Sequence, residues 1–218
     1  MQNVCNEKKF VHDVYDNIAQ DFSRTRTRVW NEVKSFIDSI DINTNCLEIG
    51  CGNGKNMYRR DIVMTGIDTC EAFVKICLQK SLNASIMDCY HLQYEDNSFD
   101  NIMSIAVFHH LSTEERRIKA LSEMIRVLKP NGTGFVSLWS FENQNHVKNK
   151  FIQGDNLVNW KHSITGQLFQ RYYYIFDESK VNKYFDEFCD NIKLIHKINV
   201  LGNWYIKFKK NEKNEHPR

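Results

Sequence analysis

Apolar residues follow a helical period in the first forty positions of the chain and then gather into short continuous runs. Phe10, Val14 and Ile18 lie four residues apart, which is typical of one face of a helix. The segment 29–40 repeats this pattern and predicts a second helix. The run CLEIG, which begins at Cys46, is instead short, apolar and closed by glycine. It predicts a buried strand followed by a tight turn.

Strand-like and helical patterns then alternate. Apolar runs over 61–68, 83–89, 98–108 and 132–140 predict four more strands, and helices are expected over 70–81 and 112–128, the second stopped by Pro130 and Gly132. Such alternation favours a parallel sheet covered on both faces. The segment 191–210 reads as two strands joined by a short Gly-Asn turn, which predicts a closing hairpin.

Composition is that of a globular protein. The chain has 218 residues, of which 42% are hydrophobic and 26% charged, and this length suits one domain. No apolar run approaches the roughly 20 residues that span a bilayer, and the N-terminus lacks an apolar signal core. We therefore expect no membrane association and a cytoplasmic protein, with the nucleus as an alternative. The net charge of +2 does not by itself indicate nucleic-acid binding.

The cysteines predict neither a disulfide framework nor a metal site. There are seven, and none forms a C-x-x-C pair; they are Cys5, Cys46, Cys51, Cys70, Cys77, Cys89 and Cys189. Several lie within apolar runs, so reduced and mostly buried thiols are expected.

A glycine-rich turn follows the first predicted strand. Gly50, Gly52 and Gly54 form G-x-G-x-G, whereas the turn of dinucleotide-binding dehydrogenases is G-x-G-x-x-G. Ligands of open α/β sheets bind at the carboxyl ends of the strands. The turn is therefore a candidate ligand site, although such turns also serve only to reverse the chain.

Acidic residues stand at three successive strand ends. Asp68 closes the second predicted strand and can accept hydrogen bonds from ribose hydroxyls, and Asp88, near the end of the third, can accept from an adenine amine. Glu48 precedes the glycine turn and can meet a cationic group. S-adenosylmethionine offers all three features and has no phosphate. The alternative is that these carboxylates cap helices.

The residues quoted so far resemble a known superfamily. "LEIGCGNG", "GID", "DNSFDNIMSIAV" and "IRVLKPNGTGFVSLW" are similar to successive motifs of class I S-adenosylmethionine-dependent methyltransferases. The resemblance implies a Rossmann-like α/β fold with a seven-stranded, mostly parallel sheet and a C-terminal antiparallel hairpin. We expect one domain over 1–218, with N-terminal helices in 1–45, the cofactor-binding core in 46–140, and a substrate-side insertion and hairpin in 141–218.

The flanking segments are more selective. "VHDVYDNIAQDFSRTRTRVW", "SIAVFHHLSTEERR", "DNLVNW", "QRYYYIF" and "NWYIKF" resemble, in order, the eukaryotic tRNA wobble-uridine carboxymethyl methyltransferases. Members of this family esterify the carboxylate of 5-carboxymethyluridine in the tRNA anticodon and work with a small zinc-binding activator subunit. The chain departs from the family in its short, Lys/Asn-rich C-terminal insertion and in the Val-Asn that precedes Trp160.

The resemblance also implies site residues. Arg26 is the expected donor to the acceptor carboxylate, since guanidinium offers a planar bidentate fork. His109 and His110 follow the fourth predicted strand, where the acceptor should lie, and Ala106 just before them is expected at the cofactor. A carboxylate acceptor is already ionised and needs no general base. Either histidine could instead serve packing only.

Contacts with RNA are expected from arginine and aromatic side chains, which suit unstacked anticodon bases. Arg24, Arg171, Tyr172 and Trp139 are the candidates, although Trp139 could equally belong to the core. Arg116 and Arg117 are expected on a solvated helix face.

The third predicted strand, NASIMDC, should lie at a sheet edge, where a partner strand from the activator could add. Two rival functions stay open at this point. One is a methyltransferase for a small-molecule acceptor, and the other is a cofactor-binding scaffold without turnover.

Overall fold

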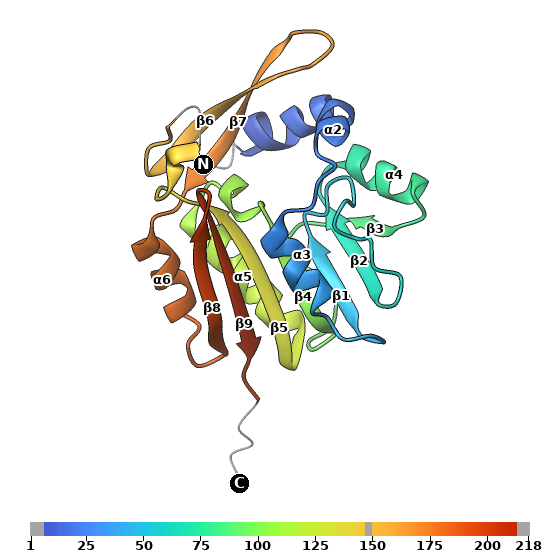
Figure 1. Ribbon diagram of the computed structural model, residues 1–218, viewed down its shortest axis with the longest axis vertical. Coiled ribbons are helices and arrows are strands. Elements are labelled where there is room, and N and C mark those ends of the chain that lie inside the picture. Colours follow the sequence, from blue (N-terminus) through green and yellow to red (C-terminus); the bar gives the residue numbers. More distant parts are fainter. Residues whose placement is uncertain (1–6, 147–149, 213–218) are drawn as a thin grey trace.

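A seven-stranded sheet forms the centre of the computed structural model, which describes residues 7–146 and 150–212. Its strands are β1 (Asn45–Ile49), β2 (Val63–Asp68), β3 (Asn83–Ile86), β4 (Phe99–Ile105), β5 (Leu128–Trp139), β8 (Ile192–Val200) and β9 (Asn203–Lys210). They lie in the order β3-β2-β1-β4-β5-β9-β8 (Figure 1). The strands from β3 to β5 pair in parallel, and β9 lies antiparallel between β5 and β8. The predicted sheet, its closing hairpin and the edge position of the third strand are confirmed.

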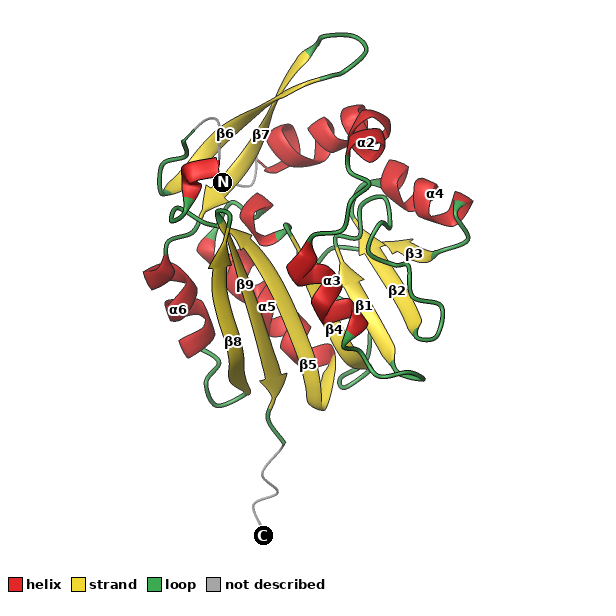
Figure 2. Cartoon of the chain, viewed as in Figure 1, coloured by secondary structure: helices red, strands yellow, loops and turns green. Residues whose placement is uncertain are grey.

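Helices cover both faces of the sheet (Figure 2). They are η1 (Lys8–His12), α2 (Asp13–Thr25), α3 (Asn31–Asp38), α4 (Glu71–Gln79), η2 (Phe108–His110), α5 (Glu114–Val127), η3 (Gln144–His146) and α6 (Glu178–Asp186). One apolar cluster joins α5 and α6 to the sheet through side chains such as Leu121, Val181 and Ile206. A second cluster joins α3 and α4 to the other face, where Phe36 stacks on Phe135 at 4.6 Å.

A separate hairpin lies beside α2 above the sheet. Strands β6 (Gly154–Lys161) and β7 (Leu168–Ile175) pair antiparallel to each other and form their own two-stranded sheet. In Figure 1 this hairpin and α2 stand together at the upper end of the central sheet. Trp160 of β6 packs with Val14 and Ile18 of α2 in one buried cluster. The β6–β7 hairpin and α2 therefore form one unit above the carboxyl ends of the strands, which we call the roof.

Several element boundaries differ from those predicted, most clearly in β5 and in the closing hairpin. The helix α5 ends at Val127, and β5 begins at Leu128, so Pro130 and Gly132 lie inside the strand rather than stopping the helix. Thr113 caps α5 by accepting a hydrogen bond from the Arg116 backbone N–H at 3.2 Å. The closing hairpin turns at Leu201 and Gly202, both in the left-handed region, one position before the expected Gly-Asn.

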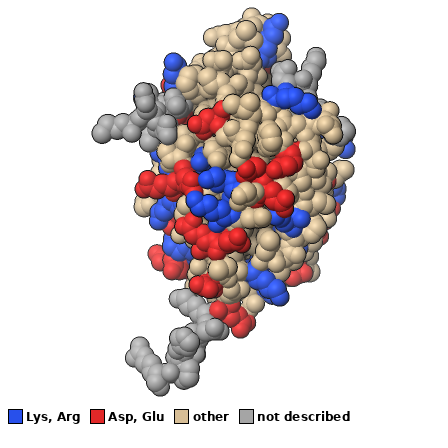
Figure 3. Space-filling view, turned by 90° about the vertical axis from the view of Figure 1, so that its left-hand side faces the viewer, with Lys and Arg blue, Asp and Glu red and all other residues tan. Residues whose placement is uncertain are grey.

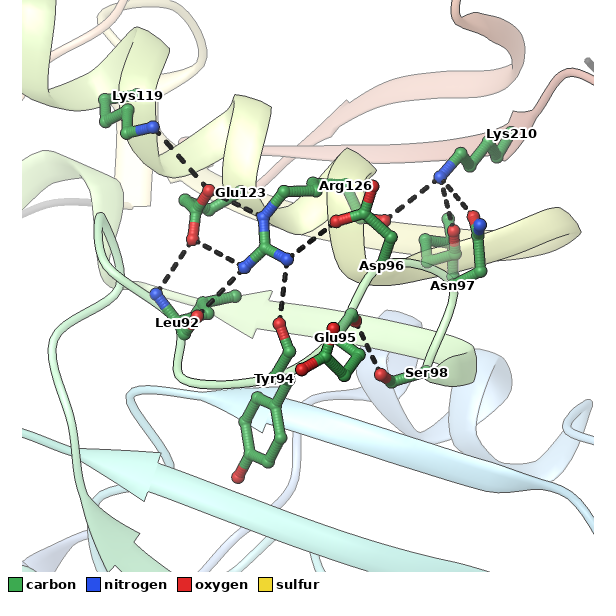
Figure 4. A network of polar contacts seen from close by, with 11 residues as sticks. Leu92, Tyr94, Glu95, Asp96, Asn97, Ser98, Lys119, Glu123, Arg126 and Lys210 are labelled. Atoms are coloured by element: carbon green, nitrogen blue, oxygen red, sulfur yellow. Dashed lines mark hydrogen bonds and ion pairs between the residues drawn. The ribbon is translucent and has the colours of Figure 1, made fainter.

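A network around Arg126 holds the loop between β3 and β4 against α5 (Figure 4). The guanidinium donates to the carbonyl oxygens of Leu92 and Tyr94 and to the Glu123 carboxylate, each at 2.8–2.9 Å. The Glu123 carboxylate also accepts from the Leu92 N–H at 2.9 Å. Hydrogen bonding to Arg126 lowers the pKa of Glu123 to about 2. This network fixes the loop that carries Asp88.

The expectation of a solvated face for Arg116 and Arg117 is wrong. Arg117 is buried, and it donates to the Tyr184 hydroxyl at 2.9 Å and to the Leu111 carbonyl at 2.6 Å. Arg116 pairs with Glu7 at 3.0 Å and lies over the Tyr90 ring. Both arginines therefore connect elements, since each finds its partner on another segment.

Among the cysteines that the structure describes, five are buried thiols and Cys189 is exposed; Cys5 lies outside the described residues. No helix in the described ranges is long and apolar enough to cross a membrane. Figure 3 shows acidic and basic side chains interspersed across the middle of one face, rather than a single basic patch.

Candidate active site

The glycine turn brings bare backbone to a cavity of about 220 Å³ at the carboxyl ends of the strands. Gly50, Gly52 and Gly54 all have positive φ, between 53° and 71°. A Cβ on Gly50 would stand 2.2 Å from the Val107 side chain, so no larger residue fits there. Gly50 and Gly52 line the cavity, whereas Gly54 lies outside its lining and packs against Leu82.

Glu48 is a buried acid on the wall of this cavity. Its Oε1 accepts a hydrogen bond from Asn56 at 2.6 Å, while Oε2 has no partner among the described residues. Burial raises the pKa of the Glu48 carboxyl to about 8. An unpartnered buried oxygen is costly unless a ligand donates to it or brings a positive charge.

Asp68 orders the glycine turn from the end of β2. Its carboxylate accepts from the Gly52 N–H at 2.8 Å and from the Cys70 N–H at 2.9 Å. Burial raises its pKa above the ordinary value. Asp88 lines the same cavity, but β3 ends at Ile86, so Asp88 lies two residues beyond the strand rather than closing it. The three predicted acids therefore share one cavity.

Ala106 also lines the cavity, at the end of β4. Its φ of 59° is rare for a residue with a side chain, and its N–H donates to the Ser137 hydroxyl at 3.0 Å. The strained turn carries the chain directly from β4 into η2, which holds both histidines.

Both histidines lie against aromatic rings of β5 and β7 on the cavity wall. His109 is buried and stacks on the Tyr173 ring at 4.5 Å, with Trp139 at 5.3 Å. Its Nδ1 has no hydrogen-bond partner among the described residues. Burial, together with His110 and Arg171 nearby, holds the pKa of His109 well below its usual range. The ring is therefore neutral at physiological pH.

His110 is held by a hydrogen bond on each nitrogen. Nδ1 lies 2.9 Å from the Tyr172 carbonyl oxygen, and Nε2 lies 3.0 Å from the Tyr15 hydroxyl. Because a carbonyl can only accept, Nδ1 carries the hydrogen and Nε2 accepts from Tyr15. Burial lowers the pKa of His110 to about 3, which agrees with a neutral ring.

The arginines predicted from the sequence separate into two groups. Arg26 and Arg171 line the cavity, and their guanidinium groups lie 5.1 Å and 4.9 Å from the centre of the same Trp160 ring. Arg24 lies outside the cavity lining and pairs with Asp21 at 3.1 Å. Tyr172 also lies outside it, with its hydroxyl bonded to Asp155, and its neighbour Tyr173 faces the cavity instead.

Three residues that the sequence did not single out hold the site together. Asn53, in the glycine turn, donates to the carbonyl oxygens of Ser23 and Arg26 at 3.2 Å and 3.1 Å. Asp21 accepts from the Trp160 indole N–H and the Ser163 N–H, both at 3.1 Å. Hydrogen bonding to Ser163 lowers the pKa of the Asp21 carboxyl to about 2. The third is Tyr15, the partner of His110. Of these three residues, only Asn53 could have been noticed in the sequence, because it lies within the glycine turn.

The residues of the cavity fit S-adenosylmethionine. Glu48 and Asp68 offer carboxyl groups beside the exposed backbone of the glycine turn, which suits the cationic amino-acid portion and the ribose of this ligand. Oε2 of Glu48, which has no partner among the described residues, can accept a hydrogen bond from the ligand. Asp88 lines the same cavity and can accept from an adenine amine, and Phe73 and Met87 add apolar surface to the cavity lining.

Comparison with known proteins decides the family. A family model described as a methyltransferase domain matches residues 47–136. A tRNA (carboxymethyluridine(34)-5-O)-methyltransferase from Schizosaccharomyces pombe is 32% identical over 94% of this chain and 98% of its own length. The chain belongs to this family. Together with the matched domain, membership confirms the predicted family, the methyltransferase class and the S-adenosylmethionine cofactor.

Other members of the family are longer. The alkbh8 enzyme of Xenopus tropicalis and an Arabidopsis thaliana enzyme, both named for the same reaction, are 39% and 41% identical to this chain. The chain spans only 23% and 34% of their lengths.

Solved structures confirm the fold. A methyltransferase from Haloferax volcanii, in complex with the Trm112 methyltransferase activator, superposes with a TM-score of 0.70. It is 15% identical to this chain, and the match covers 94% of this chain and all of that one. An S-adenosylmethionine-dependent methyltransferase from Clostridium acetobutylicum gives 0.66 at 12% identity, over 92% of this chain and 99% of its own.

Proposed function

We propose that this protein is a cytoplasmic tRNA methyltransferase that esterifies the carboxylate of 5-carboxymethyluridine at the wobble position. The observation that carries the proposal is the similarity to the Schizosaccharomyces pombe enzyme, which is named for this reaction and matches from end to end. The site of this chain supports the same chemistry, because cationic and neutral side chains line one part of the cavity. We call this part the acceptor end, and its side chains are those of Arg26, Arg171, His109 and His110.

The acceptor needs to be bound and oriented rather than deprotonated. When bound, S-adenosylmethionine supplies a methyl group on a positively charged sulfur, which an ionised carboxylate can accept without a general base. His109 and His110 are neutral because burial lowers their pKa values. We propose that they shape the acceptor end and exclude water, while Arg26 and Arg171 attract the anion.

The aromatic wall has a role in recognising the base. Trp139 and Tyr173 face the cavity next to His109, with ring centres 4.4 Å apart. A uracil ring released from its stack could lie against such a surface. Arg24 stands outside the cavity with half of its side chain exposed, which suits a contact to the RNA backbone.

We further propose a small zinc-binding activator as partner, docked on the free edge of β3. Among the described strands it pairs with β2 alone, so its outer backbone groups are open to a further strand. The Haloferax volcanii fold relative was solved with the Trm112 activator, which supports a partner of this kind.

The test is transfer of labelled methyl from S-adenosylmethionine to tRNA that lacks wobble methyl esters, with and without the activator, followed by nucleoside analysis. The expected product is a base-labile methyl ester of 5-carboxymethyluridine. If the protein binds the cofactor and, with the activator present, labels no tRNA, the proposal is wrong and a small-molecule acceptor is indicated. Replacing Asp68 by Ala should abolish both binding and transfer.

A further inference from the structure

Arg171 is a buried cation on the cavity wall without a carboxylate partner among the described residues. Only 5% of the surface of Arg171 is exposed. Nη1 donates to the Tyr15 hydroxyl at 3.5 Å, and Nε has no hydrogen-bond partner among the described groups. Arg117, the other buried arginine in the described ranges, donates to the Tyr184 hydroxyl and the Leu111 carbonyl oxygen. A buried, incompletely bonded guanidinium is costly unless an anion joins it.

The neighbours of Arg171 fix its direction. The Trp160 and Tyr173 rings lie 4.9 Å and 5.1 Å from its central carbon and restrict the guanidinium plane. The hydrogen of the Tyr15 hydroxyl goes to His110 Nε2, because His110 Nδ1 is occupied by the Tyr172 carbonyl. The Tyr15 oxygen is then left as an acceptor for Arg171.

Arg26 lacks this support. It is exposed, and the only described hydrogen bonds of its guanidinium go to the neighbouring Thr25, at 3.4 Å and 3.5 Å. Its guanidinium lies against the rings of Phe22 and Trp160. Water screens an exposed cation, so Arg26 holds an anion less firmly than a buried and preorganised guanidinium does.

We infer that Arg171 is the principal anchor of the acceptor carboxylate, that Tyr15 and His110 are positioning residues for it, and that this arrangement selects an ionised carboxymethyl group over a neutral carbamoylmethyl group. The inference rests on the proposed function and names the group that recognises its substrate. A carboxylate presents two oxygens to the guanidinium fork, whereas an amide presents one uncharged oxygen. The methyl ester product is neutral as well, so the same site favours its release.

The experiment measures binding of two anticodon stem-loops, identical except for carboxymethyl or carbamoylmethyl at the wobble uridine. The protein is used with its activator and with saturating S-adenosylhomocysteine. We expect the wild type to prefer the acid by about 10-fold to 100-fold. Arg171→Met should bring this ratio close to one, and Tyr15→Phe should lower it severalfold with unchanged S-adenosylhomocysteine affinity. Arg60→Met, at an exposed position outside the cavity, should keep it.

The outcomes separate the inference from the proposed function. Methyl transfer by the wild type to the carboxymethyl stem-loop tests the function alone. A ratio that survives Arg171→Met and collapses in Arg26→Met would assign the anchor to Arg26 and overturn the inference. Should Arg171→Met fail to fold, Arg171→Lys decides: it keeps the charge but loses the fork, so the ratio should fall while cofactor affinity stays. An unchanged ratio in Arg171→Lys would contradict a bidentate anchor.

Discussion

The residues expected to bind the cofactor could be predicted from the sequence, because they lie at the ends of predicted strands. Glu48, Gly50, Asp68 and Asp88 lie at or beside the ends of parallel strands, and such ends meet at one edge of a sheet. All four line the cavity. Predicting them required only the strand boundaries and the chemistry of a cationic, ribose-bearing ligand.

The acceptor end was less accessible to sequence reasoning because its contacts are long-range. Tyr15 meets His110 across 95 positions and Arg171 across 156, and the bond between Trp160 and Asp21 spans 139. No local period encodes such pairs. The run of three tyrosines shows the same limit: side chains alternate along a strand, but only the register of β7 decides that Tyr173 faces the cavity and Tyr172 does not.

At this scale we predict that cofactor binding releases a proton from Glu48. Its carboxyl has a pKa of about 8 in the free protein and is mostly protonated near neutral pH. A cationic ligand favours the carboxylate and lowers that pKa. Calorimetry in two buffers of different ionisation enthalpy should therefore detect release of up to about one proton, and affinity should rise between about pH 6 and pH 8.

Glu48→Gln is the control for this titration, since it cannot ionise. It should lose most of the pH dependence of cofactor affinity. The folded pKa lies above the unfolded value of about 4.3, so the stability contributed by the neutral carboxyl is present below that value and is lost as pH rises through about 8. As the pH rises from about 4.3 to about 8, the unfolding free energy of the wild type should therefore fall relative to that of Glu48→Gln. Equal pH profiles for the two proteins would contradict the assignment.

At the scale of elements, the sheet was predictable and the roof was not. The central strands β1 and β4 are mostly buried, as expected for strands that lie between helices. Strand β6 alternates in exposure whereas β7 does not, and the hairpin carries exposed apolar side chains at Leu157 and Leu168. Its position depends on Trp160 packing against α2, which a pattern within the hairpin cannot specify.

We predict that Trp160→Ala opens the roof and leaves the central sheet intact. The substitution removes packing against Val14, Ile18 and Phe22 and the hydrogen bond to Asp21. A buried tryptophan replaced by alanine typically costs about 3–5 kcal/mol. Amide hydrogen exchange should therefore accelerate by about 100-fold or more in α2 and in the β6–β7 hairpin, with little change in β1 and β4.

Trp160→Phe serves as the matched variant for the roof. It keeps an aromatic ring beside Arg26 and Arg171 but cannot donate to Asp21, so its exchange rates should rise much less. The KM for tRNA should increase more in Trp160→Ala than the dissociation constant for S-adenosylmethionine, because Trp160 contacts the acceptor-side arginines. Faster exchange throughout the sheet would mean that Trp160 supports the whole fold instead.

At the scale of the whole molecule, the two edges of the sheet differ. The β8 edge ends an antiparallel hairpin of nine-residue and eight-residue strands. Strand β3 has four residues and, within the described part of the chain, pairs only with β2. Ile86 ends β3 with 57% of its surface exposed, which leaves an apolar side chain beside open backbone groups. Such an edge favours either aggregation or a partner strand.

We therefore predict that Ile86→Lys separates solubility from assembly. A lysine at the edge disfavours strand addition, so the isolated chain should aggregate less while its affinity for the activator falls by about 10-fold or more, as expected for losing a buried apolar contact. Ile42→Lys is the matched control, with 64% exposure at a position outside the sheet. Sedimentation of each variant titrated with the activator measures both effects. If Ile86→Lys binds the activator as tightly as Ile42→Lys does, the partner docks elsewhere than on the β3 edge.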